Sequence, residues 1–231
     1  MESRHRSVGL FGPEISPSRR WRNEVASPDA VTIEAMPSTT PPPSLVLVRH
    51  GETTWNLDQL LQGHRDDAAL TDRGVRQAEH VAATLHEDVF DAIVASDLRR
   101  ARDTAAIIAR GRGLDVVTTP ALRERSYGDY EGGPLADLPA SVFVPDGELV
   151  TDADARPPGG ESLNDLYGRA RRWLAQLRTD YAGARVLVVT HGGTLRAIRA
   201  CCAATPIART RWYPVDNASV WTTDVNGNPL G

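Results

Sequence analysis

The chain has 231 residues, of which 41% are hydrophobic, and it carries a formal net charge of −4 at pH 7. This supplies the core of one ordinary domain with some additional chain, and the mildly acidic balance argues against a general binder of nucleic acid or membrane surfaces. No apolar run approaches the length of about 20 residues that a membrane span requires, and the absence of lysine excludes a lysine Schiff base and a P-loop lysine.

Residues 1–44 differ in composition from the rest of the chain. They are rich in proline, serine, threonine and arginine, show no sustained periodicity, and end in the triplet Pro41-Pro42-Pro43. This composition predicts a mostly disordered tail that finishes in a stiff polyproline segment. The tail lacks the apolar stretch of a signal peptide, and one hypothesis is that translation starts at Met36.

From Leu45 to the C-terminus the chain alternates strand-like and helix-like segments and forms the predicted domain, 45–231. Buried, β-branched runs predict strands, and apolar residues at helical spacing predict helices. The alternation indicates a three-layer α/β/α sandwich with a mostly parallel central sheet. The expected strands are 45–48, 92–95, 114–117, 185–190 and 219–223, and the expected helices are 73–86, 98–110, 162–181 and 195–204.

Charged side chains directly follow several of the predicted strands. Arg49 and His50 end the first strand, and Gly51 beside them allows backbone N–H groups to approach an anion. Arg100 comes soon after the second strand, and His191 follows the strand 185–190. Because carboxyl ends of parallel strands form the ligand crevice of such sheets, we expect these segments to converge. A guanidinium beside an imidazole is suited to holding a phosphoryl group while a ring nitrogen attacks phosphorus.

Five motifs in this order resemble those of the histidine phosphatase superfamily, also called the phosphoglycerate mutase-like family. The resemblance extends from Leu45 to about Thr223 and implies the fold of that family. Any one motif would be a weak signal, whereas all five together are specific. They are Arg-His-Gly-Glu-Thr at 49–53, Ser-x-Leu-x-Arg-Ala at 96–101, Leu-x-Glu-x-x-x-Gly at 122–128, Gly-Gly-Glu-Ser at 159–162 and Thr-His-Gly-Gly at 190–193.

The resemblance implies catalytic roles for His50, Glu124 and His191. His50 matches the nucleophile that becomes transiently phosphorylated, and Glu124 matches the acid/base residue. The positions that match those around the phosphoryl oxygens are Arg49, Arg100 and His191. Asn56 matches a lesser position of the pocket. The side-chain chemistry agrees, because a neutral imidazole is a nucleophile, and a carboxyl group can protonate the leaving alkoxide and then deprotonate water. Neither a metal ion nor another cofactor is required.

Neighbouring residues offer weaker alternatives for these roles. Glu131 could replace Glu124, but its flanking glycine favours a carboxylate that orients a turn or pairs with an arginine. The motif register selects Arg100, so Arg99 is expected to be a surface charge. His64 lies in a polar loop and is expected to be a solvated histidine.

The segment 133–158 is expected to lie over the pocket as a lid and to distinguish phosphatases from mutases. It carries five carboxylates and a single arginine, and this charge opposes the bisphosphate that a mutase must hold. We therefore expect a phosphomonoesterase that hydrolyses a small phosphorylated metabolite through phospho-His50, with a cationic or apolar substrate portion as one hypothesis. The alternatives are a mutase-type phosphotransferase and a phosphoprotein phosphatase or phosphopeptide-binding signalling protein. The carboxylates are Asp137, Asp146, Glu148, Asp152 and Asp154.

The expected partner is a small-molecule phosphomonoester, with no role for nucleic acid or membrane. Cys201 and Cys202 are adjacent, which disfavours an ordinary disulfide, and we interpret them as small core residues of a reduced, cytoplasmic protein. No exposed apolar stripe stands out, so the choice between a monomer and a homodimer stays open.

Overall fold

A computed structural model of the protein describes residues 40–228. The prediction of a disordered tail therefore falls almost entirely outside the described residues, as does the hypothesis of a start at Met36. The strands are β1 Ser44–Arg49, β2 Ala92–Ser96, β3 Val116–Thr119, β4 Arg185–Thr190 and β5 Val220–Asp224. The α-helices are α1 Thr54–Leu57, α2 Asp72–Thr84, α3 Arg99–Ala109, α4 Leu163–Asp180 and α5 Gly192–Cys202. Short 3-10 turns are η1 Pro120–Leu122, η2 Gly128–Tyr130, η3 Leu135–Asp137 and η4 Ile207–Arg209.

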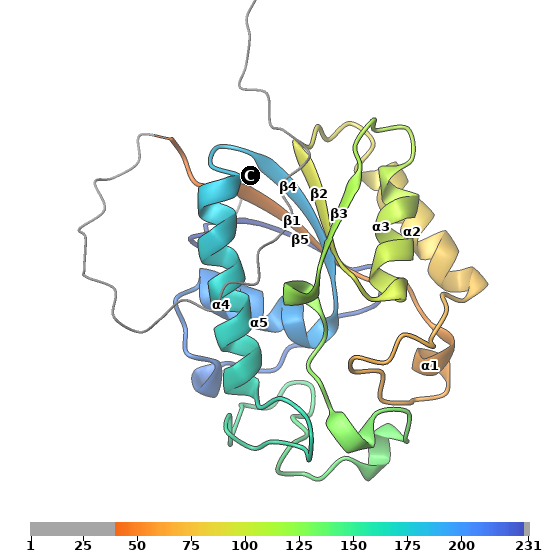
Figure 1. The fold of residues 1–231 in the computed structure, drawn as a ribbon, viewed down its shortest axis with the longest axis vertical. Coiled ribbons are helices and arrows are strands. Elements are labelled where there is room, and N and C mark those ends of the chain that lie inside the picture. Colours follow the sequence, from red (N-terminus) through yellow and green to blue (C-terminus); the bar gives the residue numbers. More distant parts are fainter. Residues whose placement is uncertain (1–39, 229–231) are drawn as a thin grey trace, which may run out of the picture. The chain divides into compact units, whose positions relative to one another are not determined.

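The five strands form one sheet in the order β3-β2-β4-β1-β5 (Figure 1). The first four are parallel and β5 pairs antiparallel with β1, which places the only antiparallel strand of this sheet at its edge. The register of β1 and β4 aligns Ser44 with Arg185 and, at the other end, Arg49 with Thr190. The residues that follow these strands, His50 and His191, therefore leave the sheet side by side.

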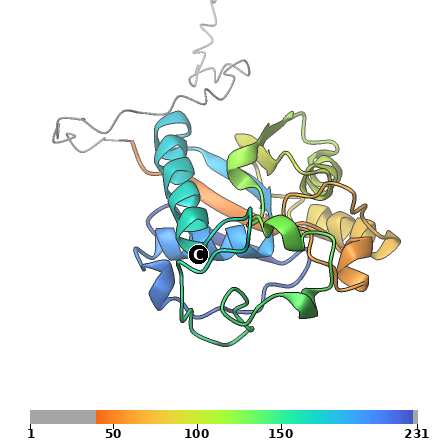
Figure 2. The ribbon, with the colours of Figure 1, turned by 60° about the horizontal axis from the view of Figure 1, so that its bottom comes forward.

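Helices cover both faces of the sheet, which confirms the predicted α/β/α layers. In Figure 1, α2 and α3 lie on one side of the sheet and α4 and α5 on the other, and the rotated view in Figure 2 shows the same separation. Side chains alternate between the faces along each strand. The core beneath α2 and α3 includes Val46, Val48, Ile93, Leu187 and Val189, packed against Val81 and Ile108.

The element bounds agree closely with those predicted, and the main omission is α1. All nine predicted strands and helices are present, although β3 begins at Val116 and not at Leu114. Helix α1 has four residues, too few to show a helical period. A capping box stabilises it, in which Thr53 and Asn56 exchange side-chain and backbone hydrogen bonds.

Both cysteines are free, in agreement with the expectation of unpaired residues. Burial raises the pKa of Cys201 to about 11 and that of Cys202 to about 12, so both thiols stay protonated at neutral pH. Between residues 40 and 228, no helix is both long enough and apolar enough to span a bilayer.

Candidate active site

The carboxyl ends of β1 and β4 bring two imidazole rings together. The ring centroids of His50 and His191 lie 5.2 Å apart, with the ring planes inclined by 60°. Both side chains are almost completely buried. Arg100, from the first turn of α3, joins them by donating from Nε to Nδ1 of His191 at 3.2 Å. Residues that are 141 positions apart in the sequence thus form one buried cluster with an arginine from a third segment.

A backbone carbonyl determines which nitrogen of His50 is protonated. Nδ1 lies 2.7 Å from the carbonyl oxygen of Gly51, and because that oxygen can only accept, Nδ1 must be the donor. Burial, together with the positive charges of Arg100 and Arg49, holds the pKa of His50 well below its ordinary value of 6.5. The ring is therefore neutral, and its Nε2 carries a free electron pair.

His191 has the opposite tautomer. Its Nδ1 accepts from Arg100, so in the neutral ring Nε2 carries the proton. Burial and the charge of Arg100 hold the pKa of His191 well below its ordinary value as well. Within residues 40–228, Nε2 of His191 is buried and has no hydrogen-bond partner. A buried donor without a partner is costly, and an anionic ligand would satisfy it.

The guanidinium of Arg100 is fixed in the protein interior. The residue is only 1% exposed, and it donates from Nη2 to the carbonyl oxygen of Gly63 at 2.8 Å and from Nη1 to that of Arg65 at 2.9 Å. Burial lowers its pKa to about 10, so it remains charged at neutral pH. Arg99 is exposed and pairs with Asp103 at 3.3 Å, which confirms it as a surface charge.

Arg49 supplies a second cation to the cluster. Its Nη1 donates to the carbonyl oxygen of Val215, whereas its Nε is buried and has no hydrogen-bond partner among the described residues. Burial lowers the pKa of Arg49, an effect that the negative charge of Glu124 opposes. Arg49 and His191 thus each carry a buried N–H donor that no described residue satisfies.

Gly51 lies at a close contact between two segments of the chain. Its N–H donates to Oγ1 of Thr104 at 3.0 Å and is therefore already engaged inside the protein. A Cβ at this position would lie 2.4 Å from the carbonyl oxygen of Gly74, in the first turn of α2. The glycine permits close packing of the segment after β1 against α2, and its own N–H is not available to an anion.

The side chain of Glu124 lies at the N-terminus of α5, although the residue is far from both histidines in sequence. Its Oε2 accepts from the N–H of Gly193 at 3.0 Å, and its Oε1 accepts from the N–H groups of Thr194 and Arg125 at 3.1 and 2.8 Å. A Cβ on residue 193 would lie 2.4 Å from Oε1, so only glycine permits this approach. The start of α5 therefore positions both His191, its N-cap, and the Glu124 carboxylate.

Asn56 connects to the histidines indirectly. Its Oδ1 accepts from the N–H of Thr53 at 3.1 Å and from Nδ2 of Asn217 at 3.2 Å. Asn217 in turn donates to the carbonyl oxygen of His50 at 3.1 Å. The amide oxygen of Asn56 is therefore committed to the loop around His50, and its Nδ2 donates no hydrogen bond within the part of the chain that the structure describes.

Two arginines outside the expected set hold the Glu124 segment in place. Arg169 of α4 pairs with both carboxylate oxygens of Glu161, at 3.0 and 2.8 Å, and donates to the carbonyl oxygen of Glu124 at 3.0 Å. Arg125 is 3% exposed and donates to the carbonyl oxygens of Val142, Ala155 and Glu161. In sequence, neither residue differs from any other arginine beside an apolar position, so only the fold identifies them.

Two alternatives weighed from sequence have clear outcomes. Glu131 accepts hydrogen bonds at Oε1 from His64 N–H, Tyr127 N–H and the Ser126 hydroxyl, so it organises a turn as predicted. The expectation of a solvated His64 was wrong, because its side chain is 31% exposed and Nε2 lies 2.9 Å from the carbonyl oxygen of Glu124. His64 supports the same segment as Arg169.

The segment 133–158 lies beyond the carboxyl ends of the strands, at the bottom of Figure 1. Its carboxylates are largely engaged within the protein. Asp146 pairs with Arg196 at 2.7 Å, Asp152 accepts from the N–H groups of residues 154 and 155, and Asp154 accepts from Asn164 at 2.6 Å. Arg196 therefore offsets the charge of Asp146, whereas Asp152 and Asp154 accept from neutral N–H groups and keep their negative charge.

The family model described as "Histidine phosphatase superfamily (branch 1)" matches residues 45–229. This chain belongs to the histidine phosphatase superfamily. It is 43% identical over 161 residues to phosphoglycerate mutase-like protein 4 of Arabidopsis thaliana, an alignment that covers 67% of this chain and 68% of the relative.

Solved structures of the superfamily with this fold include named phosphatases. The mycobacterial glucosyl-3-phosphoglycerate phosphatase is 32% identical with a TM-score of 0.64, over 78% of this chain and 88% of that one. The alpha-ribazole phosphatase of Shigella flexneri is 31% identical with a TM-score of 0.67, over 78% and 90% of the two chains. Both of these proteins are named as phosphatases.

Proposed function

We propose that this protein is a phosphomonoesterase that hydrolyses a small phosphorylated metabolite through a phosphohistidine on His50. The observation that carries the proposal is the pairing of tautomers at the ends of β1 and β4. His50 holds an unshared electron pair at Nε2, while His191 Nε2 and Arg49 Nε are buried donors without partners among residues 40–228. A nucleophile next to unsatisfied cationic and neutral donors is suited to a phosphoryl group.

In the first step, Nε2 of His50 attacks phosphorus, and the N–P bond forms as the ester P–O bond breaks. Arg49, Arg100 and His191 stabilise the charge on the phosphoryl oxygens, which persists through a loose transition state. Glu124 acts as the general acid and gives a proton to the departing alkoxide. In the second step, Glu124 takes a proton from water, the water oxygen attacks phosphorus, and the N–P bond breaks to release orthophosphate. We propose Asn56 as a residue that orients the loop carrying His50.

Hydrolysis is supported by solved structures of the family, and transfer stays the second candidate. Two solved structures of similar sequence are named as phosphatases, whereas the Arabidopsis relative is named for its likeness to a mutase. The proposed mechanism assigns stabilisation of the phosphoryl charge to Arg49, Arg100 and His191 and uses no metal ion. The two unreactive thiols fit a reducing compartment such as the cytoplasm.

The test is phosphate release from a panel of phosphomonoesters in the presence of EDTA, comparing the wild type with His50→Ala. The panel includes 3-phosphoglycerate with and without the bisphosphate, scored for isomerisation as well as release. We expect chelator-resistant release that falls by at least about 10⁴-fold in the variant. His80→Ala, which changes an exposed histidine of α2, is the matched control and should retain full activity.

Other outcomes would refute the proposal in distinct ways. Isomerisation without release would make the protein a mutase-type phosphotransferase. Activity retained in His50→Ala would remove the phosphohistidine mechanism, and loss of activity on adding EDTA would remove its independence from metal. Absence of turnover on the whole panel would favour the signalling alternative.

A further inference from the structure

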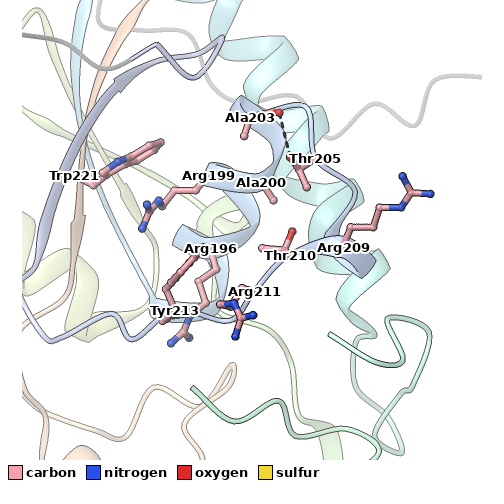
Figure 3. A pocket seen from close by; sticks show the side chains of 10 residues that line it. All are labelled: Arg196, Arg199, Ala200, Ala203, Thr205, Arg209, Thr210, Arg211, Tyr213 and Trp221. Carbon is pink, nitrogen blue, oxygen red and sulfur yellow. Dashed lines mark hydrogen bonds between the residues drawn. The ribbon is translucent and has the colours of Figure 1, made fainter. Parts of the chain in front are cut away.

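A cavity is lined by residues of α5, of the segment 205–213 and of β5. It encloses about 300 Å³, within the range of small-molecule sites. Figure 3 shows Arg199 beside Trp221, with the side chain of Arg209 extending away from them. None of the six residues proposed for phosphoryl transfer lines it. The residues used below are Arg196, Arg199, Arg209, Arg211, Tyr213 and Trp221.

The charge of this cavity is uniformly positive. Four arginines line it and no carboxylate does. Arg196 is paired with Asp146, but Arg199, Arg209 and Arg211 form no ion pair with any carboxylate among residues 40–228. In a chain with a net charge of −4, three uncompensated guanidinium groups around one hollow concentrate a positive potential there. Such a site attracts anions.

Aromatic rings hold two of these guanidinium groups in place. Arg199 lies over the ring of Trp221, with its Cζ 4.7 Å from the centroid, and Arg196 lies over Trp212 at the same distance. Stacking fixes the plane of a guanidinium and leaves its edge free to donate hydrogen bonds in pairs. Tyr213, 52% exposed, adds a further aromatic face. The lining therefore combines preorganised donors for phosphate or carboxylate oxygens with apolar surface.

The cavity is separate from the phosphoryl pocket but adjacent to it. A Cβ built on Gly192 would meet Nη1 of Arg196 at 3.5 Å and Nε of Arg49 at 3.7 Å, so Arg196 lies between the two sites. The cavity wall also supports the segment 133–158, since Val150 N–H donates to the carbonyl oxygen of Thr210 and Gly147 N–H donates to that of Trp212. The two sites therefore share a boundary while using different residues.

We propose that this cavity binds a small anionic molecule that carries phosphate or carboxylate groups beside an apolar or aromatic portion, in addition to the substrate. The volume selects a small molecule over a macromolecular ligand. The arginines without an ion-pair partner attract an anion, and the rings of Trp221 and Tyr213 offer apolar surface to a flat or apolar part of the ligand.

The test uses phenylphosphonate, an aromatic anion that has no ester bond to hydrolyse, in calorimetric titration of the full chain. The wild type should bind two equivalents, one in each site. The double variant Arg199→Gln/Arg211→Gln should lose one equivalent or bind it at least tenfold more weakly. Arg102→Gln/Arg172→Gln, which neutralises two exposed arginines of α3 and α4, is the matched control and should bind two equivalents.

Turnover separates this proposal from the proposed function. Release of p-nitrophenol from its phosphate, and inhibition of that release by phenylphosphonate, should be unchanged in Arg199→Gln/Arg211→Gln, because neither residue belongs to the phosphoryl pocket. Retention of every wild-type equivalent by Arg199→Gln/Arg211→Gln, whether the wild type binds one or two, would overturn the proposal, as would an equal loss in the control. These stoichiometries decide the matter even if the protein hydrolyses none of its tested substrates.

Discussion

Arg100 and Arg125 are both buried arginines that donate to backbone carbonyls, yet they serve two different regions. In the phosphoryl pocket, Arg100 uses two carbonyls to fix its guanidinium and turns Nε toward His191. In the segment 133–158, Arg125 gives its side-chain donors to the carbonyls of residues 142, 155 and 161. Backbone carbonyls fix the guanidinium of Arg100 so that its Nε contacts His191. The guanidinium of Arg125 instead fixes the backbone segments whose carbonyls it contacts.

The comparison shows where rigidity comes from in each region. The pocket is built on the ends of paired strands and the start of α5, where the sheet itself sets the positions of the side chains. The segment 133–158 has one short 3-10 turn and isolated bridges to Leu60 and Arg211, so side-chain anchors carry more of its order. Changes in the pocket should therefore affect chemistry, and changes in the segment should affect local stability.

After His50→Ala, the largest effect is expected from Glu124→Gln. Glutamine keeps the shape of the side chain but cannot transfer a proton, so kcat for an alkyl phosphate should fall by about 10²–10⁴-fold. The loss should be smaller for p-nitrophenyl phosphate, whose leaving group departs without protonation. Steady-state kinetics with β-glycerophosphate and p-nitrophenyl phosphate check this, with Glu131→Gln as the control for a turn carboxylate. Equal losses on both substrates would remove the acid role of Glu124.

Gly193→Ala should disturb the same carboxylate without altering its chemistry. The new methyl group would lie 2.4 Å from Oε1 of Glu124 and must displace it. A shift of about 1 Å in a catalytic group can cost about 10²-fold in rate, and we expect a loss of that order in kcat. Gly168→Ala is the matched control, because there a Cβ meets only the flexible end of Arg172 at 3.4 Å. Wild-type kinetics in Gly193→Ala would contradict the close approach.

Arg125→Met tests whether side-chain anchors stabilise the segment 133–158. It removes the donors for three carbonyl groups, and we expect the free energy of unfolding to fall by about 1–3 kcal/mol. Limited proteolysis should accelerate within residues 133–158, while kcat for p-nitrophenyl phosphate changes less than KM. Urea unfolding and mass mapping of the fragments measure these effects against the exposed control Arg172→Met. Cleavage spread evenly over the chain would show that Arg125 is not a local anchor.

The smallest effect is a dependence of stability on pH. Burial holds the pKa values of His50 and His191 below 6.5. As the pH falls below about 6.5, these two histidines therefore bind protons in the unfolded chain but not in the folded chain. The free energy of unfolding should therefore fall as the pH drops below about 6.5, by up to about 1.4 kcal/mol per pH unit for each histidine. Urea unfolding at pH 7.5 and 5.5 should show a shallower fall in His50→Gln. Identical slopes in the two proteins would show that His50 is not held neutral.

The sequence by itself determined the fold class, because strands such as 45–48 and 185–190 are continuous apolar runs and the intervening helices have a clear period. It also placed Arg49, His50, Arg100, Glu124 and His191 at the ends of elements, since local motifs are contiguous in the chain. The tautomers, however, depend on the distance from His50 to the Gly51 carbonyl and from His191 to Arg100, and only the tertiary structure decided these. The same holds for Gly51, His64 and the lid carboxylates, whose partners are set by packing between segments far apart in sequence. Periodicity reports which face of an element is buried, but a hydrogen-bond partner is chosen by three-dimensional contact.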